Sequence, residues 1–345
     1  MEDVAPMEAT SVEEIPAGDG WQYEPKWDGF RCVAYREGDD VELRSKAGLP
    51  LARYFPDIVA AVRSVKAKRF VVDAEIVIPT PDGKGLSFDA LLQRIHPAES
   101  RLNQLSAETP GWLVVFDLLQ EGAKSLLALP LRERRPRLDA FAAKNFPREG
   151  AVRLSPATTE MAQATKWLGS VGASLDGIIA KQLDAPYAAG ERGAMMKIKA
   201  RRTADCVVGG FRYAEKARVV GSLLLGLYDD EGLLHHVGFC SGLKAAERPA
   251  LTEKLEAVRG GPSFTGRAPG GPSRWSTKRS TEWESLNPQL VVEVEFAHVT
   301  GERFRHGTSL LRWRPDKAPE QCTMEQLKQK SSRMLALLES RNAKD

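Results

Sequence analysis

The segment EPKWDGFR, residues 24–31, places an amine, a carboxylate, a glycine and a guanidinium close together: Lys26, Asp28, Gly29 and Arg31. A deprotonated lysine is a nucleophile, but its ordinary pKa is about 10.4, so nearby cations would have to lower it. A simpler interpretation is a β-hairpin, because Asp-Gly favours a tight turn with positive φ. This segment alone leaves both interpretations open.

Further segments combine charged or aromatic residues with apolar runs typical of strands. In chain order they contain Glu75 (VVDAEIVI), Phe116 (VVFDLL), Asp176 and Lys181 (DGIIAK), Lys197 and Lys199 (KIK), and Arg314, Asp316 and Lys317 (RPDK). Cations such as these could surround Lys26, destabilise its ammonium form and bind phosphate. Simpler explanations compete, because an aromatic residue in a central strand usually belongs to the core and a surface arginine usually binds nothing.

The elements that must position these residues form an α+β pattern over residues 21–199. Turn residues divide 21–46 into short antiparallel strands. Continuous apolar runs predict central strands, buried on both faces, at 69–78 and 111–119, and a further strand is expected at 176–182. Helical spacing of apolar residues predicts helices at 87–95, 130–144 and 158–172.

The pattern changes after KARRTAD. Short, closely spaced strands with one helix at about 244–258 predict an all-β barrel of the OB type. Frequent Gly, Pro and Ser predict a mobile loop at 260–280, and a terminal helix is expected at about 323–340. We therefore expect domains at residues 1–200 and 201–320, followed by a C-terminal helix within 321–345.

Composition limits the class of protein. The 345 residues include 49 Lys and Arg against 46 Asp and Glu, so the net charge of +3 does not by itself indicate nucleic-acid binding. The four cysteines form no CxxC pair, which argues against a zinc module or a disulfide framework. Because neither a signal-peptide pattern nor an apolar run of about 18 residues is found, we expect an intracellular protein without a membrane span.

Taken in order, these segments resemble the motifs of the covalent nucleotidyltransferase superfamily, which includes ATP-dependent DNA ligases and mRNA capping enzymes. The resemblance runs from about residue 21 to 320, and EPKWDGFR, TADCVVGGFR and RWRPDK are most similar to bacterial ligase C and the ligase domain of ligase D. It implies an α+β, antiparallel-sheet, ATP-grasp-like nucleotidyltransferase domain followed by an OB-fold barrel. Two positions depart from the pattern: Ala74 replaces the usual Gly, and Asp176 replaces the commoner Glu.

The resemblance also implies roles for individual residues, with ATP and Mg²⁺ (or Mn²⁺) as cofactors. Lys26 would attack the α-phosphate of ATP and form a lysyl-AMP linkage. The expected catalytic residues are Lys26, Asp28, Arg31 and Lys199. The expected nucleotide-binding residues are Glu24, Lys26, Arg31, Arg44, Glu75, Phe116, Ile178, Arg192, Lys197, Lys199, Arg314 and Lys317, with Phe116 and Ile178 on the two faces of the adenine. The expected metal ligands are Glu75 and Asp176.

The implied function is the ATP-dependent sealing of 3′-OH/5′-phosphate nicks in duplex DNA, through lysyl-AMP and a DNA-adenylate, in DNA repair. The barrel would close over the nucleotide, bringing Arg314 and Lys317 to the pyrophosphate, and then swing away to present another face to DNA. Expected partners are nicked duplex DNA, held mainly through its phosphates, and repair polymerase/primase or end-joining proteins. We expect a monomer in the cytoplasm, associated with the nucleoid.

Other classes stay open. An RNA ligase or a capping guanylyltransferase is built from the same motifs, and labelling with GTP or a requirement for RNA at the 3′-OH side would identify one. A non-catalytic relative could use the barrel as a DNA-binding module, although such a module has no need of a nucleophilic lysine. An NAD⁺-dependent ligase is less expected, because those enzymes add zinc-finger and other domains.

Overall fold

The computed structural model describes residues 3–170, 175–200, 202–215, 217–270, 282–297, 299–328 and 335–339. The chain divides into two units, Met1–Ala200 with Gln329–Asp345, and Arg201–Lys328. Part of the predicted loop 260–280 lies outside the described residues, and its described part, 260–270, contains neither helix nor strand. Across the described residues, no helix combines the length and apolar character that are needed to cross a bilayer.

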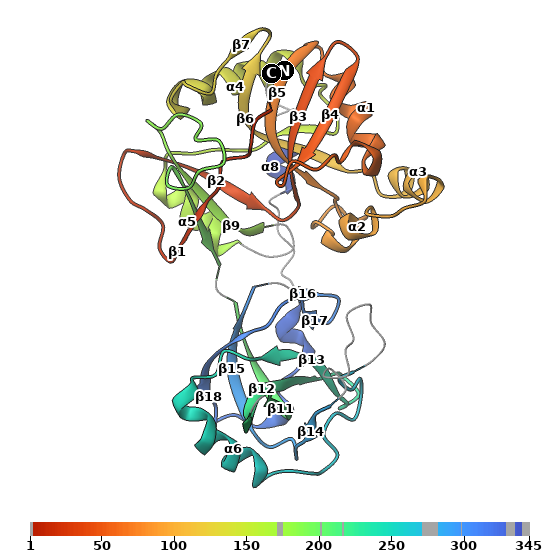
Figure 1. The fold of residues 1–345 in the computed structure, drawn as a ribbon, viewed down its shortest axis with the longest axis vertical. Helices are drawn as coiled ribbons and strands as arrows, with labels where there is room; N and C mark the ends of the chain where they lie inside the picture. Colours follow the sequence, from red (N-terminus) through yellow and green to blue (C-terminus); the bar gives the residue numbers. More distant parts are fainter. Residues whose placement is uncertain are drawn as a thin grey trace. The chain divides into compact units, whose positions relative to one another are not determined.

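The larger sheet of the first unit has the strand order β4-β3-β5-β6-β7 (Figure 1). Strand β8 pairs with β6. Its strands are β3 (Phe30–Glu37), β4 (Asp40–Ser45), β5 (Arg69–Val77), β6 (Trp112–Glu121), β7 (Lys124–Ser125) and β8 (Val152–Leu154). Both β5 and β6 are interior strands, and neighbouring side chains such as Val71 and Val72 enter two different apolar cores. The prediction of two central strands buried on both faces is confirmed.

Helices α1 (Pro56–Ser64), α2 (Phe88–Gln93) and α4 (Leu131–Asn145) pack against this sheet, and α3 (Glu99–Glu108) packs against α1. Ile58 of α1, Leu91 of α2 and Leu138 of α4 share one core with the sheet. The predicted helices at 87–95 and 130–144 are confirmed, and the Ser87 hydroxyl caps the first by accepting a 3.2 Å hydrogen bond from the Ala90 amide. The sequence analysis missed α1 and α3.

The smaller sheet has the order β1-β10-β9-β2. Its strands are β1 (Thr10–Val12), β2 (Trp21–Trp27), β9 (Leu175–Gln182) and β10 (Met195–Lys199). Helix α5 (Met161–Gly169) packs against β2 and β9, which confirms most of the predicted helix at 158–172; residues 171–174 lie outside the described part of the chain.

The connection between β2 and β3 passes from one sheet to the other, so the hairpin interpretation of EPKWDGFR is wrong. Gly29 does not have a positive φ. A Cβ at this position would instead lie 2.3 Å from the carbonyl oxygen of Ile76 and 2.8 Å from Cγ of Glu75. Glycine is therefore required because the connection passes directly over β5.

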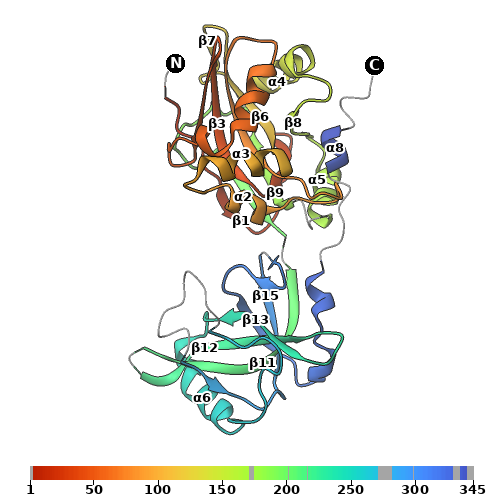
Figure 2. The same ribbon diagram turned by 90° about the vertical axis from the view of Figure 1, so that its right-hand side faces the viewer.

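The last described residues return to the first unit. Helix α8 (Ala336–Glu339) lies beside α5 (Figure 2). Leu335, and Leu338 in α8, are buried in one apolar core with Trp167 of α5. The described residues do not form the single terminal helix expected within 321–345. A 3₁₀ turn over Met324–Leu327 ends at Lys328, whose ψ of 121° is not helical, and residues 329–334 and 340–345 are not described.

The second unit contains antiparallel sheets and helix α6 (Arg248–Glu256). Its strands are β11 (Arg202–Ala214), β12 (Ala217–Tyr228), β13 (Leu234–Cys240), β14 (Glu284–Ser285), β15 (Val291–Phe296), β16 (Val299–Thr300), β17 (Arg303–Phe304) and β18 (Ser309–Trp313). The main sheet has the order β13-β12-β11-β15-β18, with β14 beside β11, and β16 pairs with β17. In the described residues these pairings do not close a barrel, so an OB fold is not confirmed.

Candidate active site

Strand pairing in the smaller sheet aligns Lys26, Gly177 and Lys199 across β2, β9 and β10. Beside them, Oδ2 of the buried Asp176 lies 2.6 Å from Lys26 Nζ and 3.3 Å from Lys199 Nζ. Gly177 has a φ of +150°, and a Cβ there would lie 2.0 Å from the Ile198 carbonyl oxygen, so only glycine allows this approach of β9 and β10. Two ammonium groups thus share one carboxylate.

Arg31 is fixed by a buried carboxylate. Its Nε and Nη2 donate to Asp73 Oδ1 and Oδ2 at 2.6 and 2.5 Å, and the Tyr187 hydroxyl donates to Oδ2 at 2.6 Å. Burial by itself would lower the pKa of Arg31, but the charge of Asp73 outweighs it, and the pKa lies above its ordinary value. The guanidinium lies 4.6 Å from the centroid of the Phe116 ring, so a permanent positive charge faces this aromatic side chain.

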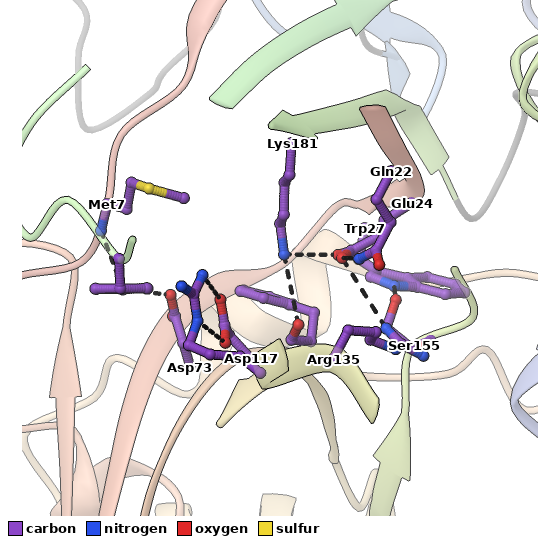
Figure 3. Close-up of polar contacts among 12 residues, drawn as sticks. Met7, Gln22, Glu24, Trp27, Asp73, Asp117, Arg135, Ser155 and Lys181 are labelled. Atoms are coloured by element: carbon purple, nitrogen blue, oxygen red, sulfur yellow. Dashed lines mark hydrogen bonds and ion pairs between the residues drawn. The ribbon is translucent and has the colours of Figure 1, made fainter. Parts of the chain in front are cut away.

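A second buried cluster surrounds Glu24 (Figure 3). Lys181 Nζ lies 2.8 Å from Glu24 Oε2 and 4.6 Å from the centroid of the Phe116 ring. Gln22 Nε2 donates to Glu24 Oε1 at 2.7 Å, and Arg135 Nη1 lies 4.0 Å from the same oxygen. Because both carboxylate oxygens have partners, Glu24 holds a set position beside the ring.

Several of these residues line a cavity of about 250 Å³. Its described lining includes Glu8, Glu24, Lys26, Arg31, Lys46, Glu75, Phe116, Ile179, Lys181, Arg192 and Lys197. Burial, followed by the charges of Lys199 and Lys26, lowers the pKa of Lys197. Burial raises the pKa of Glu75 to about 7, although Arg31 and Lys26 oppose the shift. The cations of this lining favour a polyanionic ligand.

Known families match nearly the whole chain. Residues 6–199 match the ATP dependent DNA ligase domain, and residues 216–317 match the ATP dependent DNA ligase C terminal region. The chain belongs to the ATP-dependent DNA ligase family. It is therefore an enzyme, a covalent nucleotidyltransferase, of a family that uses ATP.

Relatives of this ligase include DNA ligase C1 of Mycolicibacterium smegmatis, which is 41% identical over 94% of this chain and 93% of its own length. The multifunctional non-homologous end joining protein LigD of Mycobacterium bovis is 29% identical over 94% of this chain and 40% of its own length. A solved structure from a study of Lig E DNA ligases covers 91% of this chain and 100% of its own, with a TM-score of 0.51 and 17% identity, and shows a similar fold.

The candidate site gathers many of the residues predicted from the sequence. Those that line the cavity are Glu24, Lys26, Arg31, Glu75, Phe116, Arg192 and Lys197, and Asp176 and Lys199 lie beside Lys26. Asp28 lies in the connection that follows β2, and its charge contributes to the raised pKa of Glu75.

Two predicted residues lie elsewhere. Ile178 is fully buried in an apolar core on the opposite face of the small sheet, and Ile179 lines the cavity in its place. One step along a strand reverses the face, so the expected contact of Ile178 with adenine does not fit this geometry. Arg44 on β4 pairs with Asp3 and Glu42 and is not part of the described lining.

The sequence analysis missed several polar residues of the candidate site. Asp73 lies two residues before Glu75 on the same strand, and this spacing could have placed both side chains on one face. Tyr187, Lys46 and Glu8 lie outside the motif residues named from the sequence. Contacts between distant segments alone bring them to the site.

The second unit contains the other predicted cations. Arg314 Nη1 lies 2.8 Å from Oδ1 of the buried Asp205, and Lys317 Nζ lies 2.7 Å from its Oδ2. Arg314 also pairs with Asp316 at 2.9 Å. The amide and carbonyl of Asp205 bond to the Gln326 side chain, each at 2.9 Å. Both cations of the RPDK segment therefore have counter-ions within their own unit.

The carboxylates of the first unit fit a hard divalent cation. Asp176 is already in contact with the two positive groups of Lys26 and Lys199. Burial raises the pKa of Glu75, and a cation bound beside it would lower that pKa again. The described residues contain no cluster of three or more His, Cys, Asp or Glu side chains arranged around a metal.

Proposed function

We propose that this ligase seals 3′-OH/5′-phosphate nicks in duplex DNA through a lysyl-AMP on Lys26 and a DNA-adenylate. The observation that carries the proposal is the position of Lys26 on the wall of a cation-lined cavity, with its Nζ 2.6 Å from Asp176. An amine in this position can reach a phosphorus atom whose charge the neighbouring cations balance.

In the first step, Asp176 takes a proton from the Lys26 ammonium. The amine then forms a bond to the α-phosphorus of ATP while the bond to pyrophosphate breaks, in line with the attack. Arg31, Lys197 and Lys199 stabilise the negative charge on the phosphate oxygens. A bound Mg²⁺ or Mn²⁺ would supply further charge neutralisation; Glu75 would hold it with phosphate and water, and Asp176 would join them whenever it does not carry the Lys26 proton.

The adenine lies against Phe116, with Ile179 rather than Ile178 on its other side. Ile179 supports this assignment because it pairs with Glu24 across β2 and β9 and lines the same cavity. Glu24 is kept in place by Lys181 and Gln22, so it can offer an acceptor at the edge of the base.

The second unit would contribute to the same reaction. We assign this unit to the OB fold. During adenylation, Arg314 and Lys317 would leave Asp205 and orient the pyrophosphate. After pyrophosphate leaves, the DNA 5′-phosphate takes the AMP from Lys26. The 3′-OH then attacks that 5′-phosphate and releases the AMP. Variants of Arg314 or Lys317 should therefore lose the first step and still seal a nick that carries AMP already.

The DNA substrate is held mainly through its phosphates, and binding should weaken as salt is raised. We place the enzyme in DNA repair, as a monomer at the nucleoid of the cytoplasm, with nicked duplex as its substrate. The relative named for non-homologous end joining supports this pathway and a polymerase/primase or end-joining protein as partner.

The test is incubation with α-labelled ATP and Mg²⁺, followed by a nicked duplex. Wild-type protein should become labelled and then seal the nick. Lys26→Ala should lose both activities, whereas Lys124→Ala, at an exposed position on β7, should keep them. Label that persists in Lys26→Ala would contradict the proposal. Label from GTP but not ATP, or sealing only with RNA at the 3′-OH, would favour an RNA-directed enzyme.

A further inference from the structure

The amino-terminal segment around Glu8 is fixed along the cavity wall. The Val4 amide donates to the Tyr35 hydroxyl at 2.9 Å, and the Met7 amide donates to the Tyr187 hydroxyl at 3.0 Å. The Glu8 amide donates to the Glu191 carbonyl oxygen at 2.9 Å. Val4 and Met7 are buried. These backbone contacts set the position of Glu8 without the help of its carboxylate.

The carboxylate of Glu8 contacts two cations of the cavity. Oε2 accepts hydrogen bonds from Arg192 Nε and Nη2 at 2.9 and 2.8 Å, and Oε1 lies 3.2 Å from Lys46 Nζ. The Glu8 side chain is 25% exposed, against 61% for Lys46 and 70% for Arg192. Hydrogen bonds from Arg192 and Lys46 lower the pKa of Glu8, so it is charged at neutral pH.

An Arg guanidinium that donates two hydrogen bonds to an oxyanion is a common arrangement for phosphate as well as for carboxylate. The other two acids of the described lining have different surroundings: Glu24 pairs with Lys181, and Glu75 lies opposite Arg31 on the neighbouring strand. Glu8 is therefore the acid that contacts the Lys46 and Arg192 side of the cavity.

We propose that Glu8 competes with the phosphates of the nucleotide for two cations. Its carboxylate holds Lys46 and Arg192 in the free enzyme and is displaced from them by the β- and γ-phosphates of ATP. This inference rests on the proposed function. Glu8 thereby selects for charge, because a triphosphate can displace a carboxylate more readily than a monophosphate can. It also assists the departure of pyrophosphate, since the carboxylate returns to the same cations.

The test compares Glu8→Gln with wild type in two measurements. The first is the KM for ATP in self-adenylation, and the second is the affinity for inorganic pyrophosphate, measured by calorimetry without ATP. Removal of two partly exposed ion pairs should lower both the KM and the pyrophosphate Kd by about three- to tenfold. The difference should shrink at high salt, because screening weakens the contacts that Glu8 makes.

Matched variants separate charge from shape. Glu8→Asp keeps the carboxylate and should resemble wild type, and Glu14→Gln removes an exposed charge from the same part of the chain and should also resemble it. If Glu8 served only to order its segment, Glu8→Gln would bind ATP and pyrophosphate as well as wild type does, or less well. Either result would overturn the inference.

The two proposals fail in different ways. Wild-type protein that takes no label from ATP contradicts the proposed function, whereas normal labelling with an unchanged pyrophosphate Kd in Glu8→Gln contradicts only the role of Glu8. Pyrophosphate binding requires no adenylation, so this arm tests Glu8 in either case.

Discussion

The two groups of motif cations in this ligase differ in how their charge is balanced. In the first unit, Lys26 and Lys199 share the single carboxylate of Asp176, and cationic neighbours help to lower the pKa of Lys197. In the second unit, Arg314 and Lys317 each contact their own oxygen of Asp205, and Arg314 adds Asp316. The first group can accept an anion as it stands, whereas the second must first give up partners that stabilise its own fold.

The largest expected effect comes from removing the shared carboxylate. Asp176→Asn should lower the rate of self-adenylation by about a hundredfold or more, because the amide cannot accept the Lys26 proton or bind a cation as well. Quantitative labelling with α-labelled ATP measures the rate. Asp184→Asn, at an exposed acid of the same unit, is the control. If the self-adenylation rate of Asp176→Asn lay within threefold of the wild-type rate, the proposed chemical difference between the two groups of motif cations would be contradicted.

An intermediate effect, on stability, is expected in the second unit. Asp205→Asn leaves Arg314 and Lys317 with a weakened buried acceptor, and should lower the free energy of unfolding by about 1 to 2 kcal/mol. Denaturant titration measures this loss. Asp316→Asn removes the exposed partner of Arg314 and should cost less. Equal losses would show that Asp205 has no special part in holding the cations.

The last expected effect, of a size similar to that of Asp205→Asn, concerns Glu75 and pH. Its pKa in the folded enzyme is raised from 4.5 to about 7, so the folded state retains a proton that the unfolded state has released. The contribution of Glu75 to stability is therefore lost as pH rises from about 4.5 through 7. Unfolding titrations without nucleotide or metal should show Glu75→Gln gaining about 1 to 2 kcal/mol over wild type between pH 5 and pH 8. Parallel pH profiles would contradict this.

Long apolar runs and motif order allowed much of the first unit to be predicted. Strands β5 and β6 and helices α2 and α4 follow from patterns within short windows of sequence. Helix α3 was missed because only Leu102 and Leu105 of its ten residues are buried, which leaves little apolar periodicity to detect. The order of the sheets was also beyond local patterns, since residues 24–31 were compatible with a hairpin although β2 and β3 lie in different sheets.

The residue types of this ligase already contain the groups that the proposed chemistry needs: a lysine that can attack phosphorus, acids that can bind a cation, and glycines where strands pass closely. Which of these groups meet depends on the three-dimensional fold. It turned Ile179 rather than Ile178 to the cavity, joined Arg31 to Asp73 and Tyr187, and brought Glu8 to Lys46 and Arg192. Strand register and the packing of distant segments depend on the whole folded chain, whereas the identity of each reactive group is given by its own residue.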